Sequence, residues 1–102
     1  MTMARDHVVT LISINYAKDA LEQMVPTETG REVFCQQHSI SQSEFFDAGR
    51  NGLNPQHKLI VFEGDYQSET IAELDGVRYS IYRTFQGKGD FIELYLARKA
   101  GV

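Results

Sequence analysis

Residues 70–85 read TIAELDGVRYSIYRTF, and this stretch decides the fold class. From residue 77 onward, large apolar side chains alternate with small or polar ones, which is typical of a half-buried β-strand. The predicted inner face carries Val77, Tyr79, Ile81 and Phe85, and the other face carries Arg78, Ser80 and Thr84. Asp75-Gly76 suits the positive φ angles of a type I′ turn, and residues 70–74 supply the preceding strand. The stretch therefore predicts a β-hairpin.

Four further segments are rich in apolar, β-branched and aromatic residues and are predicted as strands. They are residues 8–16, 32–38, 58–63 and 91–98. The last of these is apolar on both faces, which favours a central or covered strand. About six strands with polar connections indicate a mainly β fold, an antiparallel barrel or sandwich. The length of 102 residues fits one domain over 1–102.

One short helix is expected at about residues 41–50. Ser41 is placed as the N-cap and Glu44 as the third helical residue of a capping box. Ile40 precedes the cap and is positioned to pack on Phe45, and we expect Phe45 and Phe46 to anchor the helix to the rest of the fold.

The end of this helix is weakly specified. Gly49 and Gly52 each cost about 1 kcal/mol relative to alanine inside a helix, and Asn54-Pro55 stops any continuation. The helix is therefore near its limit of stability, and the segment could refold when a partner binds.

Composition excludes several classes of function. The net charge is −4, and no dense cluster of Lys and Arg is present to track a phosphate backbone. Cys35 is the only cysteine, so an internal disulfide is excluded. The apolar runs near the N-terminus are short and interrupted, so neither a signal peptide nor a membrane span is expected.

No group of residues predicts catalysis or metal binding. Cys35 and His38 have an odd spacing that sends them to opposite faces of a strand, and with His7 and His57 they match no zinc-ligand spacing. The Gly87-Lys88-Gly89 loop lacks the remaining P-loop residues and is better explained as a hairpin turn. The carboxylate pairs Glu63 and Asp65, and Glu73 and Asp75, are expected to be solubilising groups at strand ends. We therefore expect no enzyme activity, no metal and no cofactor.

The aromatic residues of the second half offer an alternative. A set of tyrosines and phenylalanines could stack nucleic-acid bases as in OB-folds. The set is Tyr79, Tyr82, Phe85, Phe91 and Tyr95. Core packing is favoured, because a basic groove around them is lacking. An OB-like nucleic-acid or ligand binding module nevertheless stays open as the rival interpretation, and a small enzyme is less favoured still.

Four stretches, read in order, carry a family resemblance. They are REVFCQQHSISQSEFFDAG (31–49), HKLIVFEGDY (57–66), ELDGVRYSIYRT (73–84) and DFIELYLARKAG (90–101). From residue 31 onward the chain resembles the head-tail joining proteins of tailed bacteriophages, also called head-closure, head-completion or stopper proteins. No single stretch is diagnostic, and the succession carries the resemblance.

The resemblance implies a structural virion protein with a small β-barrel-like fold. Copies would form a ring beneath the portal vertex of a phage or prophage, close the DNA-filled capsid and provide the platform for the tail. The implied partners are other copies, the portal or adaptor protein and the tail terminator, with double-stranded DNA passing unbound and no membrane involved. The implied location is the head-tail connector of the virion, with assembly in the host bacterial cytoplasm.

The resemblance also implies a role for the connection between the second and third strands in closing the channel. On this sequence that connection is residues 40–56, expected to be mobile and to change conformation on ring assembly. Its candidate residues are Ser41, Glu44, Phe45, Phe46, Gly49, Arg50, Gly52 and Asn54.

Residues 17–30 match no signature of the family. They are expected to form a mobile polar connection of about 14 residues, or to hold a helical turn near residues 20–24. Candidate partner contacts there are Asp19, Glu22, Thr27, Glu28 and Arg31. Which of the two connections would face the channel is left open.

Overall fold

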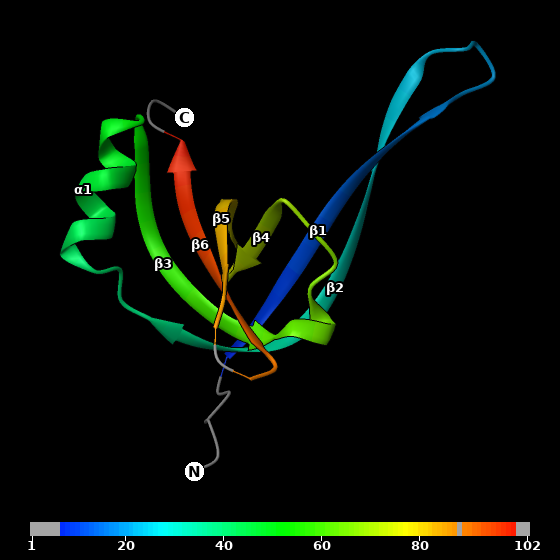
Figure 1. Cartoon of the computed structure of the whole chain (residues 1–102). Coiled ribbons are helices and arrows are strands. Elements are labelled where there is room, and N and C mark those ends of the chain that lie inside the picture. The colour runs from blue at the N-terminus through cyan, green and yellow to red at the C-terminus, as the bar shows by residue number, and fades with distance from the viewer. Residues whose placement is uncertain (1–6, 88, 100–102) are drawn as a thin grey trace.

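The structure, a computed structural model, describes residues 7–87 and 89–99, and within them the chain is mainly β. Six strands and two short helices follow one another along the chain (Figure 1). They are β1 (His7–Lys18), β2 (Met24–His38), α1 (Gln42–Arg50), β3 (Leu53–Phe62), the 3₁₀ helix η1 (Glu63–Asp65), β4 (Ile71–Leu74), β5 (Val77–Gln86) and β6 (Phe91–Lys99). The predicted mainly β fold with one short α-helix is confirmed.

The strands form one closed antiparallel barrel in the order β1-β2-β3-β6-β5-β4. Closure depends on β4, a strand of four residues that pairs with β5 on one side and with β1 on the other. The contact with β1 runs only from Thr10 to Ile12. Of the two predicted architectures, barrel and sandwich, the chain therefore adopts the barrel.

The barrel interior is filled by alternate residues of the strands, as period-two patterning predicts. The buried cluster consists of Val9, Leu11, Val33, Cys35, Leu59, Val61, Ala72, Leu74, Leu94 and Leu96. Cys35 is fully buried among these apolar side chains, so it is a core residue. The side chains of Tyr79 and Ile81 pack against the same cluster.

The hairpin predicted for residues 70–85 has the expected turn. Asp75 and Gly76 have φ angles of 53° and 81°, the positive values that a type I′ turn requires. The loop from Gly87 to Asp90 joins β5 to β6, and Gly87 N–H donates to the Phe91 carbonyl over 3.0 Å. Lys88 of this loop, like Ala100 and Gly101 of the last matched stretch, lies outside the described residues.

The prediction for the apolar face of β5 is correct for only two of its four residues. Tyr79 and Ile81 face the core, but Val77 lies beside the turn and Phe85 is 53 % exposed. The reason is a register shift: Ile81 pairs with Leu96 but Arg83 pairs with Tyr95, so Tyr82 is an extra residue in β5. A bulge of this kind reverses the face of every later side chain, which places Phe85 outside.

Strand β6 is covered on both faces, which confirms the prediction for residues 91–98. Its residues from Leu94 to Ala97 are all buried, although successive side chains point to opposite faces. Leu94 and Leu96 fill the barrel, whereas Tyr95 and Ala97 lie on the outer face. Helix α1 packs on the neighbouring strand β3 (Figure 1).

The largest difference from the sequence-based expectation concerns residues 17–30, which are not a long loop. The pairing of β1 with β2 continues to Lys18 and Met24, so only residues 19–23 connect the strands. The Asp19 carboxylate closes this turn by accepting hydrogen bonds from the N–H groups of Leu21 and Gln23, both over 2.9 Å. The expected helical turn near residues 20–24 is therefore wrong.

Beyond the barrel, β1 and β2 leave the wall together as a two-stranded arm (Figure 1). We call residues 13–30 the arm. β1 pairs with β4 only at residues 10–12, and β2 pairs with β3 only at 35–38. All arm residues from Asn15 to Gly30 are exposed. The molecule is consequently elongated, with extents of 53 × 33 × 23 Å.

Candidate functional site

Helix α1 begins as predicted but is anchored differently. The Ser41 hydroxyl accepts a hydrogen bond from Glu44 N–H over 3.2 Å, so Ser41 is the N-cap. The buried residues of the helix are Glu44 and Ala48, one turn apart on the face toward the barrel. The side chains of Phe45 and Phe46 are 48 % and 57 % exposed. The prediction that the two phenylalanines anchor the helix is therefore wrong.

The carboxylate of Glu44 binds β5. It accepts hydrogen bonds from the Tyr82 hydroxyl, over 3.0 Å, and from the Arg83 guanidinium. The predicted capping box is therefore only half formed, because its acidic member is the tie between α1 and the barrel. Burial, and then the hydrogen bond to Glu44, raises the pKa of Tyr82 well above its usual value.

The anchor of α1 rests on a small aromatic and charged layer between helix and sheet. The Arg83 guanidinium lies 4.7 Å from the centre of the Tyr95 ring, and the Tyr82 and Tyr95 rings are 6.1 Å apart. Burial and a hydrogen bond to Glu93 raise the pKa of Tyr95 to about 12. A single carboxylate thus links the helix to a layer that belongs to the barrel.

The remaining candidate residues of the 40–56 connection do not converge on a site. Arg50 is 3.7 Å from Asp47 in an exposed pair within the helix. Gly52 has a φ of 75°, which suits the turn after the helix. Asn54 pairs with Arg98 in the β3–β6 ladder, so the connection ends at β3 and is shorter than expected. Gly49 faces open space.

The five candidate contacts of residues 17–31 separate into two groups. Asp19 and Glu22 form the arm tip, where Glu22 has a φ of 59°, and Thr27 lies opposite Asn15 in the arm. Glu28 and Arg31 instead make ion pairs with the barrel.

Glu28 is bound by Arg78 of β5 through two hydrogen bonds of 2.8 and 2.9 Å. Arg78 also lies 3.3 Å from Glu73 of β4. Because β4 and β1 stand between β5 and β2 in the barrel order, this pair reaches across two strands to the base of the arm. The hydrogen bond from Arg78 lowers the pKa of Glu28. The interaction links the base of the arm to β5.

Arg31 is a second tie at the base of the arm. Its guanidinium donates to the Glu69 carboxylate and to the Asp65 carbonyl, both over 2.6 Å. Burial alone would raise the pKa of Glu69, but hydrogen bonds from Arg31 and from Gln67 N–H lower it overall. The loop between η1 and β4 is thereby attached to β2.

The arm itself exposes apolar side chains. Its large exposed members are Tyr16, Leu21, Met24 and Val25, with Leu21 at the tip 77 % exposed. Cross-strand pairing places Tyr16 and Met24 on one face and Val25 on the other. Within the described part of the chain, the outer edges of the arm strands have no neighbouring strand. Exposed apolar groups beside open strand edges are typical of a contact surface.

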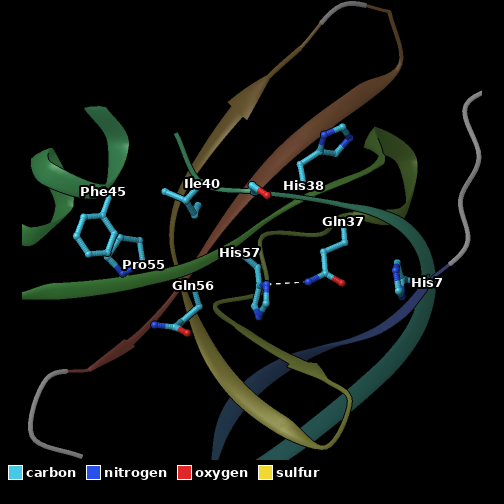
Figure 2. Close-up of a pocket in the computed structure, with 9 residues that line it drawn as sticks. His7, Gln37, His38, Ile40, Phe45, Pro55, Gln56 and His57 are labelled. Carbon is cyan, nitrogen blue, oxygen red and sulfur yellow. Dashed lines mark hydrogen bonds between the residues drawn. The ribbon is translucent and has the colours of Figure 1, made fainter. Parts of the chain in front are cut away.

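The fold also brings together the three histidines that looked scattered in the sequence. His7, His38 and His57 all line an open groove of about 580 Å³ near α1, with Phe45 on its far side (Figure 2). Gln37 Nε2 lies 2.8 Å from His57 Nδ1. Burial lowers the pKa of His57, and the charge of Asp75 opposes this effect. Sequence spacing could not reveal the groove, because its residues come from three different strands, a connection and helix α1.

The groove does not assemble a metal site. No group of three or more His, Cys, Asp or Glu side chains suited to a metal ion occurs in residues 7–87 and 89–99. In Figure 2 the ring of His38 points away from that of His57. The aromatic residues of the OB-like interpretation are divided between the two sides of the barrel wall. Tyr79 packs on the core, whereas Tyr82, Phe85, Phe91 and Tyr95 belong to the outer side of β5 and β6.

No known family model matches this chain, and no curated protein is significantly similar to it in sequence. Across the described residues, no helix has the length and apolar character needed to cross a membrane.

Proposed function

We propose that this protein is a structural assembly module without catalytic activity, and that copies form a ring at the head-tail interface of a tailed phage or prophage. The ring would close the DNA-filled capsid below the portal and offer the docking platform for the tail. The observation that carries the assembly role is the arm: a closed barrel extends two of its strands out of its own core. The assignment to the head-tail connector rests on the sequence resemblance.

The arm adds little to the stability of the fold unless a partner covers it. An exposed two-stranded ribbon is marginally stable alone, because it buries few side chains on either face. Open strand edges also invite unwanted pairing, and proteins usually shorten or cover them. A ring provides cover for every arm, since each copy presents one surface to the next and a different surface to the previous copy. Assembly into a ring would therefore cover the surface that the arm exposes.

Helix α1 is the proposed channel-closing element. Glu44 and Ala48 are its buried residues, whereas Phe45 and Phe46 face outward. Loss of one carboxylate contact would free the helix from β5, and the exposed phenylalanines could then pack against neighbouring copies. Protection of α1 amides from hydrogen exchange should therefore change when the ring assembles; unchanged protection would count against this role.

The acidic chain suits a DNA conduit. A net charge of −4 gives DNA little to bind, so packaged double-stranded DNA can pass without being held. A strongly basic inner wall in the assembled ring would contradict this part of the proposal.

The direct test mixes the purified chain with the portal protein of the same phage or prophage and images the product by electron microscopy. We expect a ring of this chain on the tail-facing end of the portal. A chain that leaves the portal bare, or binds elsewhere on the capsid, would overturn the proposal. Salt-dependent binding of the free monomer to single-stranded DNA would instead support the OB-like alternative.

A further inference from the structure

A second exposed apolar surface lies on the barrel wall, separate from the arm. Val8 pairs with Phe34 across β1 and β2, and Phe62 pairs with Phe91 across β3 and β6. Phe34 and Phe62 each lie one residue beyond the last β2–β3 pair, Cys35 with Val61. We call Val8, Phe34, Phe62 and Phe91 the phenylalanine band.

The band faces outward. Val33 and Cys35 flank Phe34 in sequence and are buried, so the alternation of β2 directs Phe34 away from the core. Val61 is buried next to Phe62 in β3, so Phe62 also points away from the core. The exposed fractions are 61 % for Phe34, 45 % for Val8 and 39 % for Phe62. A row of exposed apolar side chains over adjacent strands is typical of a contact surface.

The arm and the band cannot cover each other within one chain. On the β1–β2 hairpin, Val8 and Phe34 of the band lie on the same outward face as Tyr16 and Met24 of the arm, at the opposite end. At the usual strand rise of about 3.3 Å per residue, Val8 and Lys18 stand about 33 Å apart along β1. The two surfaces can therefore meet only between different copies.

Charge favours the same pairing. On the outward face of the arm, Lys18 lies opposite Met24. On the outward face of β2, Glu32 is exposed two residues from Phe34. With the arm laid so that its β1 strand lies on the Glu32 side of Phe34, a contact between Met24 and Phe34 brings Lys18 near Glu32 and sets opposite charges at the rim of an apolar contact. This is the arrangement usual in protein interfaces.

We propose that the outward face of the arm, carrying Tyr16 and Met24, packs on the phenylalanine band of a second copy. Because the two surfaces differ, the contact is heterologous: each copy gives its arm to one neighbour and its band to another. Such contacts build rings when the rotation closes. The contact rests on the proposed ring assembly and specifies which surfaces form it.

Cysteine cross-linking tests the contact directly. The native Cys35 is the only cysteine of the sequence and is fully buried, so it should not form disulfides with cysteines introduced on the surface. One preparation carries Met24→Cys and the other Phe34→Cys. A disulfide forms only when the two Cβ atoms come within about 4.5 Å, so a mixed dimer under mild oxidation reports the contact.

The matched control is Val25→Cys mixed with Phe34→Cys, because Val25 neighbours Met24 but points to the other face of the arm. We expect the mixed dimer with Met24→Cys and its loss with Val25→Cys, both in concentrated free protein and on the portal. Equal cross-linking by both, or by neither, would overturn the contact.

A second pair of variants checks the band without cysteines. Phe34→Ser should weaken self-association in sedimentation, whereas Val25→Ser, at an exposed apolar side chain on the other face of the arm, should leave it unchanged. A ring on the portal without the cross-link would refute this contact while sparing the proposed function. A cross-linked chain that never binds the portal would refute the proposed function and spare the contact.

Discussion

Strands β1 and β2 each contain a region in the barrel wall, where alternate side chains are buried, and a region in the arm, where the side chains are exposed. In the barrel wall, Val9, Leu11, Val33 and Cys35 alternate with outward residues and are buried to 7 % exposure or less. In the arm the same two strands keep perfect register but bury nothing from Asn15 to Gly30. Pairing of backbones alone therefore does not explain why the arm exists. Its side chains have no role in this chain's own core, which is the physical ground for the proposal that a partner covers them.

The largest effect should follow from a cavity in the wall. Leu11→Ala removes a fully buried side chain of the core cluster. We expect the free energy of unfolding to fall by about 3 kcal/mol, the usual cost of this truncation. Urea denaturation followed by circular dichroism measures it. A much smaller loss would mean that Leu11 is packed no better in the wall than an exposed residue is in the arm.

The next effect should come from the tie between α1 and β5. Glu44→Ala removes an acceptor of two hydrogen bonds, one of them charged, and leaves Tyr82 and Arg83 without it. Because the Arg83 side chain is half exposed, we expect a loss of about 1–2 kcal/mol, together with faster hydrogen exchange in α1.

The control for the helix is Arg50→Ala, which breaks the exposed pair with Asp47 and should change stability by less than about 0.5 kcal/mol. Equal effects of the two variants would show that Glu44 does not anchor the helix.

A smaller, pH-dependent effect should appear at the base of the arm. The folded-state pKa of Glu69 is lowered from 4.5, so its ion pair with Arg31 contributes stability above that pH. The contribution is lost as the pH falls through the lowered, folded-state pKa. Urea unfolding of the wild type and of Glu69→Gln between pH 7 and 3 should therefore give curves that converge in acid. Parallel curves would contradict the linkage.

The smallest effect should come from the arm tip. Leu21→Ala truncates the same residue type as in the wall variant, but at a site that is 77 % exposed. Its stability should change by less than about 0.5 kcal/mol, as for most surface substitutions. A loss comparable to that of Leu11→Ala would show that the arm is packed against the barrel in solution.

Sequence patterning predicted those features of the fold that local chemistry determines. The Asp75-Gly76 turn, the N-cap at Ser41 and the alternation that buries Tyr79 and Ile81 are each written in a few adjacent residues. Phe85 was misplaced because the bulge at Tyr82 depends on the partner strand β6. Such a shift leaves no mark in the strand's own pattern.

The arm and the helix anchor were missed for different reasons. An exposed ribbon has polar and apolar residues mixed on both faces, so residues 17–30 resemble a loop in composition. The alternating β-branched residues Val25, Thr27 and Thr29 were the available signal for a strand. In the helix, a capping motif fixes where α1 begins but not which face meets the barrel. Nothing local shows that Glu44 bonds to Tyr82.

Hydrogen exchange measured on free and portal-assembled protein tests the central claim most directly, because it reports wall and arm in one experiment. The account predicts that the amides of residues 13–18, 24, 25 and 27–30 exchange readily in the free chain and become protected on assembly, while those of Leu59 and Leu94 stay equally slow. Arm amides that exchange at the same rate in both states would contradict it.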